Sequence, residues 1–279
     1  MKKLLSILFA LSMAVSLTAA ISANSTGETS TAAYATVAPV IDGQIDEIWN
    51  HTAHQTISVP EEYEYDITGG YTAILWDETG YYLLAVVEDI SLTENDPEAR
   101  NSVDFWFSEA NTKTDSFSSD PGDWHFCKAS DGTECYYTGN EKVYSAAKSA
   151  VTTSEDGYIV ELYVPYLGTK APSLGAKIGY TVSFNDDVDN DGARDGYVFW
   201  SVTADSDAYW EKTLALPDVE LVQGPTLEEL GIVTETTPEV VDTPAAEAVV
   251  ISPKTADASW IAAIAAVLSA AGYIFAKKH

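Results

Sequence analysis

The chain has 279 residues, of which 46% are hydrophobic, and its 43 acidic residues against 14 basic ones give a formal net charge of -29. Such a charge repels nucleic acid and anionic lipid, so the composition excludes proteins that bind either of them through a basic surface. It suits neutral ligands and cations, and it equally suits a chain that only has to stay soluble outside a cell.

The N-terminus has the pattern of a secretory signal peptide. Lys2 and Lys3 precede an apolar run, and small residues follow it up to Ala23. The run is shorter than the roughly 20 residues of a membrane helix, which favours a cleaved signal over an anchor. We therefore predict that residues 1–23 are a signal peptide, with cleavage after Ala20 or Ala23, and that the mature chain is extracellular.

Seven segments in the middle of the chain have the composition of β-strands. Each is rich in β-branched and aromatic residues, several alternate apolar with polar side chains, and turn sequences separate them. They are residues 70–77, 81–89, 102–109, 123–130, 157–165, 177–186 and 196–202. Convincing helical periodicity is absent between Tyr71 and Val222, although one helical turn fits residues 45–50. We predict an all-β fold, an antiparallel β-sandwich of the jelly-roll kind, over residues 34–223.

The two cysteines of the chain, Cys127 and Cys135, flank the sequence KASDGTE. If residues 130–132 form a three-residue hairpin loop, the cysteines face each other at a Cα separation of about 4.5–5.5 Å, which a disulfide can bridge. A two-residue Asp-Gly turn would place them on a diagonal, which suits a disulfide less well. Sequence leaves both arrangements open, so the pair is a candidate disulfide.

The stretch NDDVDNDGARDG, residues 185–196, begins like the calcium loop of an EF-hand. An EF-hand needs flanking helices and a Glu at its twelfth position, whereas the twelfth residue from Asp187 is Val198 and both flanks are predicted strands. The stretch is therefore a loop between strands. Its crowded carboxylates favour a bound calcium ion with a structural role, and a solvated turn is the alternative. The candidate ligands are Asp187, Asp189, Asp191 and Asp195.

Residues 224–252 differ in composition from the predicted sandwich. They are rich in Thr, Pro, Glu and Val and contain no aromatic residue. Thr226 and Glu229 have the spacing of a capping box, which can start one helical turn. The rest of the segment is typical of an extended acidic linker.

The last segment, residues 253–279, contains an uncharged apolar stretch from Ala258 to Ala276 and then a basic tail. Pro253, Lys254 and Thr255 match the centre of a Leu-Pro-x-Thr-Gly motif, while its Leu and Gly are replaced. The order of motif, apolar span and basic tail resembles the sorting signals that sortases of Gram-positive bacteria cleave. We predict a C-terminal membrane-anchor helix, with the chain held at the cell surface by the wall or by the membrane.

Five segments carry a resemblance that covers about residues 34–223. In order and spacing they resemble the family 9 carbohydrate-binding modules. They are APVIDGQIDEIWN (38–50), AILWDETGYYLLAVVEDISL (73–92), NSVDFWFSEANTKT (101–114), DGYIVELYVPY (156–166) and KIGYTVSFNDD (177–187). The resemblance implies a non-catalytic β-sandwich that binds plant-cell-wall glucan or xylan, with calcium in some members, and that works beside surface glycoside hydrolases.

The resemblance also implies where a sugar would bind, because in that family two tryptophans enclose the terminal sugar of a chain. Trp210 matches one of them, whereas Glu98 stands where the other is expected. Lys128 lies beside the position of a basic residue of the family. Three other aromatic residues could substitute. Trp124 follows a sequence typical of loops, Tyr209 neighbours Trp210, and Trp106 falls on the strand face opposite the apolar stripe of Val103, Phe105 and Phe107. Core positions are predicted for Trp49, Trp76 and Trp200.

Other protein classes fit the sequence less well. Met1 and Met13 lie in the predicted signal peptide, which leaves a haem-binding sandwich without its axial methionine. Short strands leave little room for the cleft of a glycoside hydrolase, and motifs such as Gly-x-Ser-x-Gly are absent. A surface adhesin or scaffold subunit that binds protein is the main alternative. We predict a non-catalytic carbohydrate-binding module displayed at a cell surface.

Overall fold

The computed structural model describes residues 20–22, 27–59, 64–90, 101–117, 122–135, 140–188, 194–202 and 209–232. All of them belong to one compact unit that spans residues 1–234. Within these ranges, no helix is long and apolar enough to cross a membrane. The predicted anchor at residues 253–279 and most of the predicted signal peptide lie outside the described residues.

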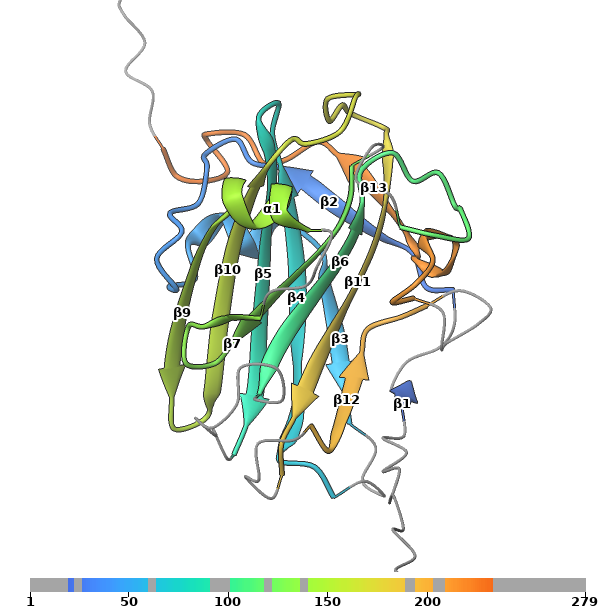
Figure 1. The fold of residues 1–279 in the computed structure, drawn as a ribbon. Helices are drawn as coiled ribbons and strands as arrows, with labels where there is room; N and C mark the ends of the chain where they lie inside the picture. The colour runs from blue at the N-terminus through green and yellow to red at the C-terminus, as the bar shows by residue number, and fades with distance from the viewer. Residues whose placement is uncertain are drawn as a thin grey trace, which may run out of the picture. The chain divides into compact units, whose positions relative to one another are not determined.

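The unit consists of strands hydrogen-bonded into one curled sheet (Figure 1). In sheet order the path is β8-β7-β6-β11-β13-β2-β4-β5-β10-β9, with β3 on β4, β12 on β11 and β1 on β12. The strands are β1 (Ala20–Ser22), β2 (Ser30–Tyr34), β3 (His54–Ser58), β4 (Ile67–Trp76), β5 (Gly80–Asp89), β6 (Ser102–Ser108), β7 (Asp123–Ala129), β8 (Glu134–Cys135), β9 (Lys148–Ser154), β10 (Gly157–Pro165), β11 (Lys177–Asp186), β12 (Gly196–Phe199) and β13 (Asp218–Val222).

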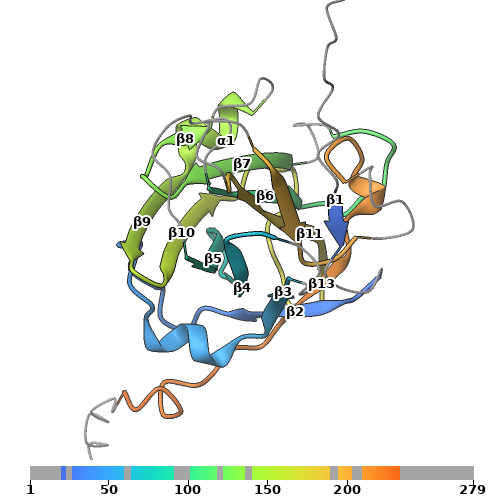
Figure 2. The ribbon, with the colours of Figure 1, turned by 90° about the horizontal axis from the view of Figure 1, so that it is seen from below.

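The sheet folds over on itself into two layers, joined along one side by β13 and β2 (Figure 2). We call β6, β7, β8, β11 and β12 the front layer, and β3, β4, β5, β9 and β10 the back layer. Pairs within each layer are antiparallel, as predicted. The two pairs at the joining side, β13 with β2 and β2 with β4, are parallel. The sandwich is therefore antiparallel in its layers and parallel where it closes.

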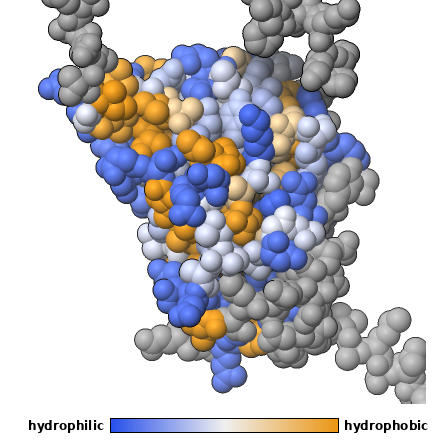
Figure 3. Space-filling model, turned by 90° about the vertical axis from the view of Figure 1, so that its left-hand side faces the viewer, coloured by the Kyte–Doolittle hydropathy of each residue, from blue (hydrophilic) through white to orange (hydrophobic). Residues whose placement is uncertain are grey.

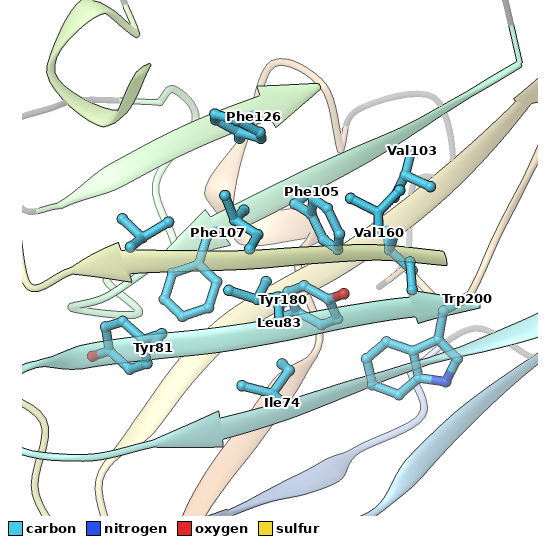
Figure 4. Close-up of a cluster of buried hydrophobic side chains, with 14 of the residues drawn as sticks. Ile74, Tyr81, Leu83, Val103, Phe105, Phe107, Phe126, Val160, Tyr180 and Trp200 are labelled. Atoms are coloured by element: carbon cyan, nitrogen blue, oxygen red, sulfur yellow. The ribbon is translucent and has the colours of Figure 1, made fainter. Parts of the chain in front are cut away.

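The core lies between the two layers and follows from the alternation along each strand. Val103, Phe105 and Phe107 point inward from β6, where they meet Tyr180 from β11 and Leu83 from β5 (Figure 4). All five are fully buried. Because each buried side chain of this size stabilises the fold by about 1.5–3 kcal/mol, the inward stripes are the main reason that the layers stay together. Trp49, Trp76 and Trp200 are buried, as predicted.

A loop and a short 3-10 helix, η1 (Glu47–His51), cover part of the outer face of the back layer. The buried carboxylate of Glu161 on β10 holds this cover in place. It accepts hydrogen bonds from the backbone N–H of Gly43 at 2.8 Å and from Trp49 Nε1 at 3.1 Å. Gly43 has a positive φ of 83°, and a Cβ there would lie 2.5 Å from Thr152 Oγ1, so the loop requires glycine at this point. Around β9 and β10 the surface mixes hydrophobic and hydrophilic patches (Figure 3).

Two short helical features bear on the predictions. The helix α1 (Glu141–Ala146) lies between β8 and β9, where the sequence has no convincing helical periodicity, because a six-residue helix is too short to show it. Thr226 and Glu229 form the predicted capping box, in which Glu229 N donates to Thr226 Oγ1 at 3.2 Å and Thr226 N donates to Glu229 Oε2 at 2.7 Å. A further 3-10 turn, η3 (Thr213–Ala215), precedes β13.

Candidate functional site

The outer face of the front layer carries a cluster of polar and aromatic side chains. Its position follows from strand register: Trp106 on β6 lies opposite His125 on β7, and Asp104 lies opposite Ser183 on β11. Because side chains alternate between the faces of a strand, these residues point away from the core that Phe105 helps to fill. The polar half of the β6 alternation therefore forms the floor of a candidate binding face.

A hydrogen-bonded network runs across this face. His125 Nε2 lies 3.0 Å from Asp104 Oδ1, and Asn185 Nδ2 donates to Asp104 Oδ2 at 2.8 Å and to Ser102 Oγ at 2.9 Å. Arg194 Nη1 in turn donates to Asn185 Oδ1 at 3.1 Å. Asp104, His125 and Asn185 are all buried, and a buried network of this kind holds its members in one geometry because unpaired polar groups there would be costly.

Aromatic rings surround the network. The Trp106 ring stacks on His125 at 3.5 Å between centroids and 7° between planes, and Tyr209 meets Trp106 edge-on at 5.6 Å. The guanidinium of Arg194 lies 4.8 Å from the centre of the Tyr197 ring. Trp106 Nε1 is buried and has no hydrogen-bond partner among the described residues. The face thus combines ring surfaces with a buried indole donor that the described residues leave unpaired.

Trp210 provides the exposed ring of this region. It is 53% exposed, and no other Trp, Tyr or Phe is exposed in the part of the chain that the structure describes. The segment that carries it is tied to residues 114–117, because Phe117 N donates to Glu211 O at 3.1 Å and Leu214 N donates to Thr114 O at 3.0 Å. Trp210 therefore projects into solvent from a segment that backbone hydrogen bonds hold in place.

The structure corrects three of the predicted sugar contacts. Tyr209 is buried in a small aromatic cluster with Phe199, because it fills the space above the front layer. Trp124 lies on β7, within the predicted strand of residues 123–130, and its side chain is buried in the core, where it stacks on Phe107 at 4.5 Å. Lys128 is buried and lies 3.6 Å from Glu134 in an ion pair. Glu98 lies outside the described residues.

Sequence reasoning missed four members of the face: Asp104, His125, Asn185 and Arg194. The alternation on β6 gave a signal for Asp104, since it placed this carboxylate opposite the apolar stripe. For His125 and Asn185 no such signal existed, because only the register of β7 and β11 against β6 brings them to Asp104. Arg194 lies in a loop, where alternation predicts nothing.

The acidic loop joins β11 to β12, so the rejection of an EF-hand is confirmed. At its base Asp195 N donates to Asp186 O at 2.9 Å, and Val188 N donates to the exposed carboxylate of Asp195 at 2.8 Å. Asp187 is buried, and its N–H donates to Asn101 Oδ1 at 3.0 Å. Asp189 and Asp191 lie outside the described residues. Among the residues described, no group of three acidic, His or Cys side chains could hold a metal, and the calcium site stays a prediction.

Asp186 is a further carboxylate at the base of this loop. Burial raises its pKa to about 6, although the N–H groups of Ile67 and Asp66 donate to its Oδ2 and act in the opposite direction. Its Oδ1 is buried without a partner in the described part of the chain. A buried carboxylate in this condition favours a neutralising partner, either a proton or a cation.

Cys127 on β7 and Cys135 on β8 lie directly opposite each other, with Cα atoms 5.1 Å apart, and form a disulfide. The hydrogen bond from Ala129 N to Thr133 O at 2.9 Å closes a three-residue loop. This is the first of the two arrangements that the sequence left open. The bond is buried and holds the two-residue strand β8 against the front layer.

A family model described as carbohydrate family 9 binding domain-like matches residues 41–223. The chain belongs to this family. The match runs from the loop before η1 to the end of β13, and so includes both layers and the face described above.

Two curated proteins illustrate the relationship. The chain is similar to endo-1,4-beta-xylanase A of Thermotoga neapolitana, with 36% identity over 176 residues, which is 61% of this chain and 16% of the xylanase. It is also similar to exoglucanase XynX of Acetivibrio thermocellus, with 32% identity over 180 residues, which is 62% of this chain and 15% of that protein. The chain thus spans only a small part of these relatives.

Solved structures confirm the fold. A family 9 carbohydrate-binding module from Caldicellulosiruptor kristjanssonii in complex with cellotriose superposes with a TM-score of 0.60 at 21% identity. The superposition covers 76% of this chain and 100% of that module. A complex of the same kind of module with glucose gives a TM-score of 0.59.

Proposed function

We propose that the chain is a non-catalytic carbohydrate-binding module that holds plant-cell-wall polysaccharide, a glucan or a xylan, on the outer face of the front layer. The observation that carries the proposal is the exposed ring of Trp210. The neighbouring Tyr209 packs against the ring of Trp106, and Trp106 stacks on His125, which belongs to the buried Asp104 network. Membership of the carbohydrate-binding family supports it.

The chemistry of a sugar fits these groups. One face of a pyranose ring is apolar and stacks on an indole, while its hydroxyls seek hydrogen bonds at the ring edge. In the proposal Trp210 supplies the stacking surface, and Trp106 supports the segment that carries it through its contact with Tyr209. Asp104 and His125 hold Trp106 in position. The negative charge of the chain does not oppose a neutral glycan.

Two buried carboxylates outside this face, Glu161 and Glu109, have structural partners, which supports a binding role rather than catalysis. Glu161 accepts N–H groups from the covering loop, and Glu109 accepts the N–H groups of Leu167 at 3.0 Å and Gly168 at 2.6 Å. Each of them therefore anchors backbone. The xylanase relatives, of which this chain matches a small part, agree with a module that works beside glycoside hydrolases.

We also propose that the module is exported and held at the cell surface. The predicted signal peptide and the predicted anchor at residues 253–279, with its sortase-like motif, support this location. A structural calcium ion in the loop of residues 185–196 belongs to the same proposal, supported by the buried and partnerless Oδ1 of Asp186 at its base. An adhesin that binds protein is the competing function, because an anchored sandwich serves either purpose.

Retention of the full chain on insoluble xylan and cellulose tests the proposal. Trp210→Ala is expected to weaken retention by about 2 kcal/mol, the effect of losing an aromatic hot spot, without lowering the melting temperature. Leu174→Ala is the matched control, because Leu174 is a 62% exposed apolar residue elsewhere on the surface. If the wild-type chain is retained on no polysaccharide but captures a protein partner, the adhesin function replaces this one.

A further inference from the structure

The outer face of the back layer contains a groove of about 310 Å³, on the opposite layer from the candidate sugar face. It lies over β3, β4 and the end of β5, beyond the area that η1 covers. Its lining includes His54, Thr56, Ser58, Gly69, Tyr71 and Glu88. A single sugar ring is small enough to enter a groove of this volume.

Strand register explains the shape of the groove. Tyr71 on β4 lies between Thr56 on β3 and Val86 on β5, and Gly69, two residues earlier, lies between Ser58 and Glu88. Residues two apart on a strand share a face, so the Tyr71 ring stands beside a position that has no side chain. The groove is therefore a slot between the Tyr71 ring and the side chains that flank Gly69.

One face of the Tyr71 ring remains open toward this slot. His54, which pairs with Ala73 on the other side of Tyr71, stacks on the ring at 4.3 Å between centroids and 8° between planes. The ring face turned toward Gly69 is the one that His54 leaves uncovered. His54 is itself fixed, because its Nε2 lies 2.9 Å from Trp49 O. Tyr71 is thus a supported ring with one free face.

The floor of the slot is backbone. A Cβ on Gly70 would lie 2.1 Å from Val86 O, so this position requires glycine. A Cβ on Gly69 would lie 3.5 Å from Glu88 Oε2, which shows that the carboxylate of Glu88 reaches over Gly69. A larger side chain at Gly69 would fill the slot, whereas a Cβ on Gly70 would point to the other face of the strand, 3.1 Å from the core ring of Phe184.

Three polar side chains around the slot are available for a ligand. Among the described residues, the side chains of Ser58 and Glu88 and the hydroxyl of Tyr71 have no hydrogen-bond partner. A free aromatic face beside a carboxylate and two hydroxyls is the set of groups that recognises a pyranose: the ring stacks, and the carboxylate accepts from sugar hydroxyls. A carboxylate at the rim also disfavours anionic ligands.

We propose that this groove, the Tyr71 slot, is a second saccharide-binding subsite that holds one pyranose ring of a neutral glycan. It takes the same class of ligand as the proposed function but shares no residue with the front-layer face. A module with sites on two layers can hold two polysaccharide chains at once. The apparent affinity of the module for an insoluble polysaccharide would then exceed the affinity of either single site for a soluble oligosaccharide.

Calorimetric titration of the full chain with cellohexaose and xylohexaose tests the proposal. Ser58→Phe is the principal variant, because an aromatic side chain opposite Gly69 covers the glycine and fills the slot at an exposed position that tolerates it. Tyr71→Ala removes the ring and should weaken binding in the slot about three- to tenfold. Ser154→Phe is the matched control, since Ser154 is also an exposed serine opposite a glycine, Gly157.

The variants are combined with Trp210→Ala so that the two sites are read separately. Support for the Tyr71 slot is residual binding in Trp210→Ala that Ser58→Phe removes and Ser154→Phe does not. The proposal of a second subsite is overturned if Ser58→Phe and Tyr71→Ala leave both the affinity and the stoichiometry of binding unchanged, in the wild-type chain and in Trp210→Ala. If Trp210→Ala changes nothing while Ser58→Phe abolishes binding, the slot stands and the front-layer proposal fails. Absence of binding in the wild-type chain overturns both.

Discussion

The imidazole of His125 and the carboxylate of Asp104 form a buried pair, with Nε2 and Oδ1 3.0 Å apart. The pair lies under the Trp106 ring, which stacks flat on His125. Since Asn185 donates to the second oxygen of Asp104, both oxygens of this carboxylate are occupied by protein donors. Asp104 therefore holds the imidazole of His125 and the amide of Asn185 in place, and in the proposed function it affects the ligand only through them.

Asp104→Asn should weaken glycan binding about tenfold. The amide has only one acceptor oxygen, so its NH₂ must face either His125 or Asn185 in a buried setting, which costs about 1–3 kcal/mol. Titration with cellohexaose and xylohexaose measures the effect, and Glu155→Gln, in the exposed turn before β10, is the control. Equal affinities for Asp104→Asn and wild type would show that the network does not support the binding face.

The disulfide gives a prediction about stability. Replacing Cys127 and Cys135 together with Ala should lower the free energy of unfolding by about 2–3 kcal/mol, because the bond closes a short loop in the unfolded chain. Urea unfolding of the double variant measures this loss. The wild-type chain, unfolded by urea in the presence of a reducing agent, should give the same free energy of unfolding as the double variant. Unchanged stability in both experiments would contradict a structural role for the bond.

Strand positions could be predicted from the sequence because their signals are local. All seven predicted segments overlap observed strands, from β4 through β12, since each alternates or concentrates β-branched and aromatic residues. The strands that escaped prediction are short or polar. β9, with the sequence KSAVTTS, is an edge strand with no buried residue, and so it shows no apolar stripe.

The candidate site could be predicted only where one residue carries the signal by itself. Trp210 was identified through the family resemblance, and its exposure agrees with that role. Trp124 was predicted inside the strand of residues 123–130, but the Gly and Pro residues before it suggested an accessible indole, whereas β7 turns the indole into the core. Tyr71 and His54 showed no signal, because their stacking depends on how β3 pairs with β4.

Removal of calcium tests the loop of residues 185–196. If the ion is present at 100 times its dissociation constant, a chelator should remove about 2.7 kcal/mol of stability and lower the melting temperature by several degrees. In the double variant Asp189→Asn with Asp191→Asn, the chelator should lower the melting temperature by less than in the wild type. Asp115→Asn, outside the loop, should behave like the wild type. A shift below one degree in the wild-type chain would remove the calcium proposal.

Glu161→Gln should destabilise the fold without changing sugar binding at the front layer. Glu161 Oε2 accepts from the N–H groups of Asp42 and Gly43, and Oε1 accepts from Trp49 Nε1. An amide has one acceptor, so at least one of these donors would face an NH₂ group at a buried site. The expected loss is about 1–3 kcal/mol in urea unfolding. Glu155→Gln, in the exposed turn before β10, should lose nothing measurable.

The lowered pKa of Asp218 predicts that the stability of the fold depends on pH. Burial raises the pKa of this carboxyl, but hydrogen bonds from Asn111, Lys113 and Lys177 outweigh it and hold the pKa well below the ordinary value of 3.8. A carboxyl with a lowered pKa contributes its full stabilisation at pH values above the ordinary pKa of 3.8. The contribution is lost as the pH falls from there toward the lowered pKa of the folded state.

Asp218→Asn should therefore lower the free energy of unfolding by about 1 kcal/mol at neutral pH, a modest value because the side chain is partly exposed. The difference from wild type should stay constant between about pH 5 and pH 8 and shrink below pH 3.8. It should also decrease in 1 M salt, which screens the two lysines. A difference that grows on acidification would show that the lysines do not stabilise the charged form, and urea titrations at each pH decide between these outcomes.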